Sequence, residues 1–219
     1  MIPVPDDVLA IVLAGGRSRR MGAMVPPGGK AALPLGDDTM LGRVCHVLVG
    51  EAGRVVVVAA QGQPLPPLPA GVEITRDTTP DRGPLAAVRD GLVYALAQES
   101  RPALAVLCSC DVPGLSPRVV QLLIRKARTS AASWIIPLVD GHPQVLVSAV
   151  TTKGFPRILS DATSHLKSPR ALVEAIRAED EKAVLFLSEA ELSAVDPAHM
   201  SFNDLDTPED FAKARRSIT

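Results

Sequence analysis

Hydrophobic positions along this chain form short apolar runs, separated by segments in which apolar residues recur at helical spacing. Short runs rich in Val, Ile and Leu predict buried strands. The predicted strands are Val8–Leu13, Arg54–Ala60, Val72–Arg76, Ala103–Cys108, Trp134–Val139, Gln144–Ser148 and Ala183–Leu187. The "DGHP" segment before Gln144 predicts a turn that pairs the two strands flanking it.

Helices are predicted between most of these strands. Their predicted positions are 40–52, 84 to about 98, 117 to about 128, 170–178 and 208 to the C-terminal region. Thr207 is the predicted N-cap of the last helix, because Pro208, Glu209 and Asp210 follow it. Strands that alternate with helices predict an α/β fold: a three-layer, Rossmann-like, mostly parallel sheet with helices on both faces. The proline-rich "GQPLPPLPAG" predicts a surface loop.

Composition and charge narrow the class of protein. The formal net charge of −1 argues against a protein built to bind nucleic acid, and 3% aromatic residues provide no stacking platform for single strands. Neither a signal-peptide pattern nor an apolar run of membrane-spanning length is evident, so we expect a cytoplasmic protein without a membrane partner.

The number of cysteines agrees with a cytoplasmic location. Three of them form no disulfide framework, which suits a reducing environment. Cys108 and Cys110 share one face of a predicted strand, so a metal site is conceivable there. Because no further His or Cys pair completes zinc spacing, buried inert thiols are the favoured interpretation.

The segment "LAGGRSRRMG", Leu13–Gly22, follows the first predicted strand and combines glycines with three arginines. In an open α/β sheet, ligands bind beyond the carboxyl ends of the strands. Glycines let backbone N–H groups approach phosphate oxygens, and arginines neutralise their charge. The loop therefore indicates a phosphate-bearing ligand, although a solvated turn would use the same glycines.

Two common phosphate loops are excluded. Gly15 and Gly16 do not fit the G-x-G-x-x-G dinucleotide fingerprint. Gly29-Lys30 resembles the end of a P-loop, but Ala31 follows it and Met24 stands where the upstream glycine is needed.

Charged residues outside this loop point to a metal ion beside the phosphate-bearing ligand. Lys30 lies a short way beyond the arginines, and Asp111 directly follows a predicted strand. A carboxylate near phosphates suits Mg²⁺, which binds through one or two carboxylates plus substrate oxygens. Asp204 and Asp206, two positions apart, would point to one side of an extended segment and supply a second metal contact. The alternative is that these aspartates only form a turn and a helix start.

Several motifs together carry a family resemblance. "VLAGGRSRRMG…GK", "RGPLAAV", "CSCDVP", "GHPQVLV" and "DLDTPEDF" occur in the order seen in the molybdenum cofactor guanylyltransferases, which are nucleotidyltransferases with a Rossmann-like sheet. The resemblance spans about Ala10 to Arg215. It implies a single nucleotidyltransferase domain over 1–219, with a nucleotide-binding half at about 1–115 and an acceptor-binding half at about 116–219.

The resemblance also implies roles for individual residues. Those that would bind the nucleotide are Leu13, Ala14, Gly15, Gly16, Arg19, Arg20, Lys30, Asp77 and Gly83. Asp111 would bind Mg²⁺, and Asp204 and Asp206 would lie near the metal and the second substrate. His142 would lie toward the acceptor. Arg20, Lys30 and Asp111 are the residues predicted to act in catalysis.

The implied reaction is transfer of GMP from GTP to the phosphate of molybdopterin, with release of pyrophosphate. Proteins of cofactor synthesis and molybdoenzymes are the implied protein partners. Three alternatives stay open: a cytidylyltransferase, a sugar-phosphate nucleotidyltransferase of the same fold, and a non-catalytic nucleotide-binding relative. The last is suggested by two departures from the family pattern, the segment "AMVPPGG" before Lys30 and the absence of Asn from "VVAAQG".

Overall fold

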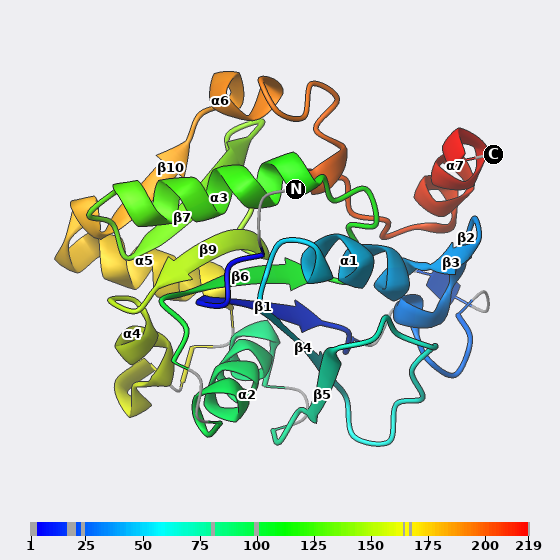
Figure 1. The fold of residues 1–219 in the computed structure, drawn as a ribbon, viewed down its shortest axis with the longest axis horizontal. Helices are drawn as coiled ribbons and strands as arrows, with labels where there is room; N and C mark the ends of the chain where they lie inside the picture. Colours follow the sequence, from blue (N-terminus) through cyan, green and yellow to red (C-terminus); the bar gives the residue numbers. More distant parts are fainter. Residues whose placement is uncertain are drawn as a thin grey trace.

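A mixed sheet of eight strands lies between helices on both faces (Figure 1). The computed structural model describes residues 4–16, 21–22, 25–79, 82–98, 101–163, 165–166 and 168–218. The strands are β1 Val8–Leu13, β2 Pro34–Leu35, β3 Asp38–Thr39, β4 Arg54–Ala59, β5 Val72–Arg76, β6 Leu104–Ser109, β7 Trp134–Val139, β8 His142–Pro143, β9 Val147–Thr151 and β10 Val184–Leu187. The helices are α1 Met40–Val49, α2 Pro84–Leu96, α3 Pro117–Thr129, α4 Phe155–Leu159, α5 Pro169–Glu179, α6 Glu189–Ser193 and α7 Pro208–Ile218.

The strand order is β10-β7-β9-β6-β1-β4-β5, with β8 paired to β7. All neighbours in the β6-β1-β4-β5 part are parallel, and β10 is parallel to β7. β9 is antiparallel to both β6 and β7. Leu13 is in register with Val58 of β4 and Ser109 of β6, so these strands end at the same edge of the sheet. The predicted three-layer, mostly parallel α/β fold is confirmed.

Both faces of the central strands are buried, as the continuous apolar run of β1 predicts. Val8, Ala10 and Val12 pack in one core cluster with residues of α1 and α3. Leu9, Ile11 and Leu13 pack in a second cluster with residues of α2, α4 and α5. Figure 1 shows α1 and α3 on one side of the sheet and α2 and α4 on the other.

A third apolar cluster joins the two ends of the chain. Its buried members are Met21, Leu33, Leu35, Met40, Leu205 and Phe211. The α7 helix begins as predicted, because the Thr207 hydroxyl accepts a hydrogen bond from the Asp210 N–H at 3.2 Å. Through this cluster, the segment that bears Lys30 and the segment that bears Asp206 lie next to each other.

The prediction for the turn region after β7 is wrong in part. Asp140 and Gly141 have positive φ angles of 49° and 72°, typical of a tight hairpin turn, and they pair β7 with the two-residue β8. Beyond Pro143 the Gln144 N–H donates to the Pro137 carbonyl at 2.9 Å, but Pro137 has no N–H to donate back to Gln144, and the pairing ends there. The second strand therefore starts at Val147 instead of Gln144 and runs between β7 and β6. Residues 144–146, between the two strands, form part of a cavity wall.

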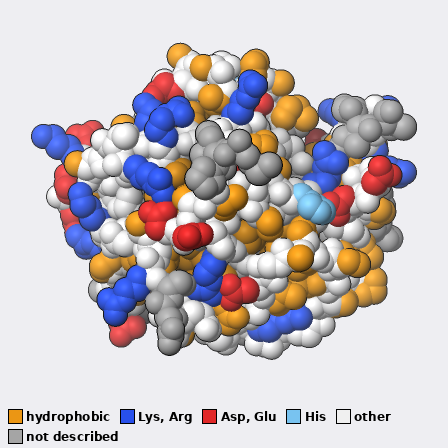
Figure 2. All heavy atoms as spheres, in the orientation of Figure 1, with side chains coloured by type: hydrophobic (Ala, Val, Ile, Leu, Met, Phe, Trp, Pro, Cys, Tyr) orange, Lys and Arg blue, Asp and Glu red, His pale blue; other side chains and the backbone are white. Residues whose placement is uncertain are grey.

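Short elements were not predicted, namely α4, α6 and the β2–β3 hairpin. Each is too short to show a periodic pattern. On the face drawn in Figure 2, Lys and Arg side chains are interspersed with Asp and Glu. Within the described residues, none of the helices combines the length and the apolar character that a membrane span requires.

Candidate active site

The loop after β1 opens onto a cavity of about 400 Å³. We call it the β1–β4 cavity, and its lining residues are Leu13, Gly15, Gly16, Val58, Ala59, Ala60, Asp77, Gly83, Pro84 and Ala87. A Cβ on Gly15 would lie 3.3 Å from the Ala60 nitrogen, so a side chain there would crowd the end of β4. The cavity thus has an apolar wall, a glycine-rich backbone edge and one carboxylate.

The N-terminus of α2 faces this cavity. Gly83 is its N-cap, with a φ of 89° that favours glycine, and no side chain caps the helix there. Pro84 occupies the first turn. Unsatisfied N–H groups at a helix N-terminus favour an anionic ligand.

Asp77 is held in place by the loop that follows β5. Its backbone N–H donates to the Ala59 carbonyl at 2.8 Å, and its carboxylate accepts from the Thr79 N–H at 2.8 Å. The adjacent Thr78 donates through its N–H and its hydroxyl to Asp90 of α2, both at 2.8 Å. The Asp77 carboxylate therefore sits on a braced loop at the cavity wall.

A second cavity of about 410 Å³ lies at the end of β6. We call it the β6–α5 cavity. Its lining residues are Ser109, Asp111, Val112, Pro143, Gln144, Val145, Leu146, Val147, Ser168, Pro169, Arg170, Phe202 and Asp204. Leu13 lines the first cavity and its register partner Ser109 lines the second, so the two cavities adjoin along one edge of the sheet.

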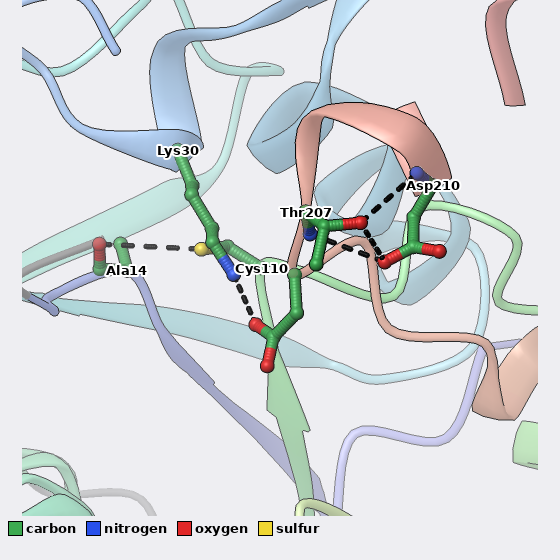
Figure 3. A network of polar contacts seen from close by, with 6 residues as sticks. Ala14, Lys30, Cys110, Thr207 and Asp210 are labelled. Atoms are coloured by element: carbon green, nitrogen blue, oxygen red, sulfur yellow. Dashed lines mark hydrogen bonds and ion pairs between the residues drawn. The ribbon is translucent and has the colours of Figure 1, made fainter. Parts of the chain in front are cut away.

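Four charged residues gather beside these cavities, and we call them the Lys30–Asp111 cluster: Lys30, Asp111, Asp204 and Asp206. The Lys30 ammonium pairs with the Asp206 carboxylate, and their side chains are only 11% and 28% exposed. The Leu205 N–H donates to the Asp111 carbonyl at 2.9 Å, which joins the segment of Asp204 and Asp206 to the end of β6. Figure 3 shows Lys30 extending toward Cys110 and the start of α7.

Negative charge is concentrated in this cluster. Asp204 is open to solvent, yet surrounding protein raises the pKa of its carboxyl, first through partial desolvation and then through the charges of Asp206 and Asp111. Among the described residues, no group of three or more His, Cys, Asp and Glu side chains is arranged to hold a metal ion. The donor set fits a hard cation such as Mg²⁺ only if phosphate or water oxygens complete its coordination.

The three cysteines take no part in this chemistry. All are buried and free. Burial raises the pKa of Cys45 and of Cys108 to about 12, and it also raises the pKa of Cys110. Thiols with such pKa values stay protonated at neutral pH, so the expectation of inert buried thiols holds.

The structure brings most of the predicted site residues together. Those at the β1–β4 cavity are Leu13, Gly15, Gly16, Asp77 and Gly83. Asp111 and Asp204 line the β6–α5 cavity, and Lys30 and Asp206 pair with each other. The Cys110 N–H donates to the Leu13 carbonyl at 3.0 Å, so the first loop and the Asp111 turn start from adjacent backbone.

Other predicted residues are placed differently. Ala14 is 4% exposed and does not line the cavity. The His142 ring nitrogen lies 2.7 Å from the Asp140 carbonyl of its own turn, and Pro143 rather than His142 lines the β6–α5 cavity. Arg19 and Arg20 lie outside the described residues.

Sequence reasoning missed several residues at the two cavities. Ser168 and Arg170 open the N-terminus of α5 onto the β6–α5 cavity, and Gln144 lines it as well. Ser168-Pro169 starts this helix just as Ser116-Pro117 starts α3. The sequence could therefore have shown that the N-terminus of α5 lies at Ser168. Gln63, which binds three backbone groups near the first cavity, had no signal in its local pattern.

This combination defines a class of protein. A Rossmann-like sheet carries a glycine-rich loop at its carboxyl edge, and a lysine and several aspartates lie beside two adjoining cavities. That is the arrangement of an α/β protein that binds a phosphorylated ligand by its phosphates.

Comparison with known proteins makes the class specific. The chain belongs to the MobA-like NTP transferase domain family, whose family model matches residues 10–187. A probable molybdenum cofactor guanylyltransferase of Mycolicibacterium paratuberculosis is 38% identical over 171 residues, which make up 77% of this chain and 82% of that protein.

Solved structures share the fold. The molybdopterin-guanine dinucleotide biosynthesis protein A of Archaeoglobus fulgidus superposes with a TM-score of 0.72 at 18% identity, over 95% of this chain and 97% of that one. The 2-C-methyl-D-erythritol 4-phosphate cytidylyltransferase of Thermus thermophilus superposes with a TM-score of 0.65 at 16% identity, over 95% and 98%. Because proteins named for different nucleotides share this fold, the fold alone does not select the base.

Proposed function

We propose that this protein transfers GMP from GTP to the phosphate of molybdopterin and releases pyrophosphate. One observation supports it most: two adjoining cavities at one sheet edge, with Leu13 lining one and its register partner Ser109 lining the other. A group-transfer enzyme must hold a donor and an acceptor side by side, and this edge has room for both. The similarity to a probable molybdenum cofactor guanylyltransferase supports the choice of substrates.

The nucleotide would occupy the β1–β4 cavity. Its apolar wall suits a base, and the Asp77 carboxylate would accept hydrogen bonds from the guanosine portion. The backbone at Gly15 and Gly16 would approach the phosphates, and Lys30 would add a positive charge. Arg19 and Arg20 would contribute further positive charge to the triphosphate.

The acceptor would occupy the β6–α5 cavity. The N-terminus of α5 opens onto it through Ser168, Pro169 and Arg170. The Ser168 hydroxyl caps the Ala171 N–H at 3.1 Å, so the helix dipole and the Arg170 charge, rather than free N–H groups, would favour an anionic group. Gln144 and Ser109 add neutral hydrogen-bonding groups to the wall. An acceptor with a phosphate and a polar ring system fits this lining.

The transfer itself requires few catalytic groups. A phosphate oxygen of the acceptor forms a bond to the α-phosphorus of GTP, while the bond to the β-phosphate oxygen breaks and pyrophosphate leaves with the electron pair. The attacking phosphate is already ionised at neutral pH, so no general base is needed. The protein must position two anions and neutralise their repulsion.

Asp111 would hold Mg²⁺, with Asp204 or Asp206 as a second contact. When bound, the ion would supply positive charge that neutralises phosphate oxygens. Lys30 would neutralise charge on the departing pyrophosphate, and the Asp206 carboxylate would hold the ammonium near its place before the nucleotide arrives.

The test is pyrophosphate release by the purified protein with GTP, Mg²⁺ and molybdopterin. We expect turnover with this set, and much slower turnover when CTP or ATP replaces GTP, when a sugar phosphate replaces molybdopterin, or when EDTA removes the metal. Preference for CTP would assign the protein to cytidylyl transfer. Nucleotide binding without pyrophosphate release under every condition would make it a non-catalytic relative.

A further inference from the structure

A single glutamine side chain, that of Gln63, connects three backbone segments at the nucleotide side of the site. Its carbonyl oxygen accepts a hydrogen bond from the Ala60 N–H at 3.0 Å. Its amide nitrogen donates to the Ala14 carbonyl at 3.0 Å and to the Gly28 carbonyl at 2.8 Å. The end of β4, the end of β1 and the segment that leads to Lys30 are therefore tied to one carboxamide, with both of its N–H donors used.

Gly28 packs closely against the loop that carries Gln63. A Cβ at this position would lie 2.7 Å from the Pro64 carbonyl oxygen and 2.6 Å from the Ala32 Cβ. The Pro64 oxygen belongs to the backbone and cannot rotate away as a side chain would. Only glycine allows the two backbones to approach this closely.

The loop that carries Gln63 is itself fixed on two sides. Arg76 of β5 donates to the Gln63 carbonyl at 2.8 Å and to the Ala60 carbonyl at 3.1 Å. Leu65 and Leu68 pack against the core cluster that contains Ala31, which lies next to Lys30 in a 3-10 helix. Prolines within the loop restrict its φ angles further.

We propose that Gln63 is a positioning residue, and that it acts with Gly28 to set Lys30 beside the backbone at 14–16 that follows β1. The role of Lys30 in this statement rests on the proposed function. The proline-rich loop at 62–71 then serves as a rigid support for the segment before Lys30. Gly28 lies two positions before Lys30, so its hydrogen bond to Gln63 and its close packing fix the start of the 3-10 helix that bears Lys30.

The first test measures docking in the ligand-free protein. Gln63→Glu keeps the size and the acceptor oxygen but replaces the two N–H donors with an oxygen that faces two carbonyls. We expect backbone amides of Gly29, Ala32 and Leu33, which form local hydrogen bonds, to exchange with deuterium several-fold faster. Exchange in α2 should stay as in the wild type. Wild-type exchange rates at residues 29–33 in this variant would overturn the proposal.

The matched control is Gln98→Glu, which makes the same chemical change at an exposed position after α2. It should leave the exchange of residues 29–33 unchanged. If it accelerates that exchange as much as Gln63→Glu does, the effect comes from net charge alone and the proposal is wrong.

The second test asks whether Gln63 acts through Lys30. Affinity for GTP, and for tripolyphosphate as a probe without a base, is measured by calorimetry for wild type, Gln63→Glu, Lys30→Ala and the double variant. We expect Gln63→Glu to lower the affinity for both ligands about tenfold when Lys30 is present. In the Lys30→Ala background, the same substitution should have little further effect on affinity. Equal losses in both backgrounds would show that Gln63 acts independently of Lys30, which contradicts the proposal.

Gly28→Ala provides an independent variant, with Gly50→Ala as its control. The added methyl at Gly28 should separate the two backbones and reproduce both effects, whereas Gly50 has room for a Cβ, with its nearest contact at 3.4 Å. Wild-type exchange and affinity in Gly28→Ala would overturn the proposal. If the wild type binds no GTP, the proposed function fails, while deuterium exchange still decides whether Gln63 docks the segment.

Discussion

Lys30 and Asp206 form an ion pair across 176 positions of sequence. Lys30 begins a 3-10 helix in the N-terminal part of the chain, and Asp206 precedes the C-terminal helix α7. The pair lies beside the end of β6, where Asp111 and Asp204 add two more carboxylates. The candidate site therefore combines residues from both ends of the chain with Asp111, which follows a central strand of the sheet.

Removal of the Lys30 charge tests its proposed contact with phosphate. We expect Lys30→Ala to weaken GTP binding about tenfold or more, since a hydrogen bond to a charged group is worth about 1.5–3 kcal/mol. Asp206→Asn removes the carboxylate that holds the ammonium and should weaken GTP binding less than Lys30→Ala does. Titration calorimetry measures both. Unchanged affinity in Lys30→Ala would place the ammonium outside the phosphate site.

Asp111 tests the proposed metal contact. We expect Asp111→Asn to lower Mg²⁺-dependent turnover about 100-fold or more, as loss of a charge-stabilising group at a reacting centre does. The melting temperature should change little, because Asp111 is only half-buried at a cavity edge. Pyrophosphate release and a thermal melt of the same preparation check both statements. Full activity in this variant would rule out Asp111 as the metal ligand.

Nucleotide preference can be measured without turnover. At a concentration of about 100 times its Kd, GTP should stabilise the fold by about 2.7 kcal/mol, a rise in Tm of about 5–10 °C. Asp77→Ala should reduce that rise, while the response to tripolyphosphate stays as in the wild type. A larger rise with CTP than with GTP would indicate the cytidylyl alternative.

The ion pair between Glu191 and Lys126 predicts a pH dependence of stability. The hydrogen bond from Lys126, followed by a backbone hydrogen bond at Ser188, lowers the pKa of Glu191 to about 2. A carboxyl whose pKa is depressed on folding stabilises the protein above its unfolded pKa of about 4.3 and loses that contribution as pH falls toward 2.

Because the Glu191 side chain is 36% exposed, solvent screening limits the effect to about 0.5–1 kcal/mol. Glu191→Gln should cost that amount of unfolding free energy at pH 7 and nothing near pH 2. Urea unfolding at a series of pH values measures the difference. Lys126→Gln should show the same window, and a pH-independent loss in Glu191→Gln would mean that packing rather than charge is responsible.

Local patterns were sufficient for the long elements. The apolar run of β1, the β-branched run of β4 and the Pro84 start of α2 each follow from neighbours in sequence. Alternation of strands and helices also placed Leu13 and Asp111 at one edge of the sheet, since parallel strands end together. The capping interaction of Thr207 was likewise a local property.

Other features depended on contacts between distant segments. β9 lies between β7 and β6 and starts three residues later than predicted, because the turn at Asp140 first pairs β7 with the short β8. The bonds of Gln63 and the Gly28 contact join segments that no periodicity relates.

For this protein, sequence alone determined the fold class and the kinds of side chain available for phosphate chemistry, because apolar periodicity and turn residues act over a few positions. Tertiary structure alone decided which of those side chains meet. Packing of α7 against the segment near β2 brings Asp206 to Lys30, and the pairing of β1 with β6 sets two cavities side by side. These contacts depend on the whole core, because they form only when apolar segments that are far apart in the sequence are buried against each other.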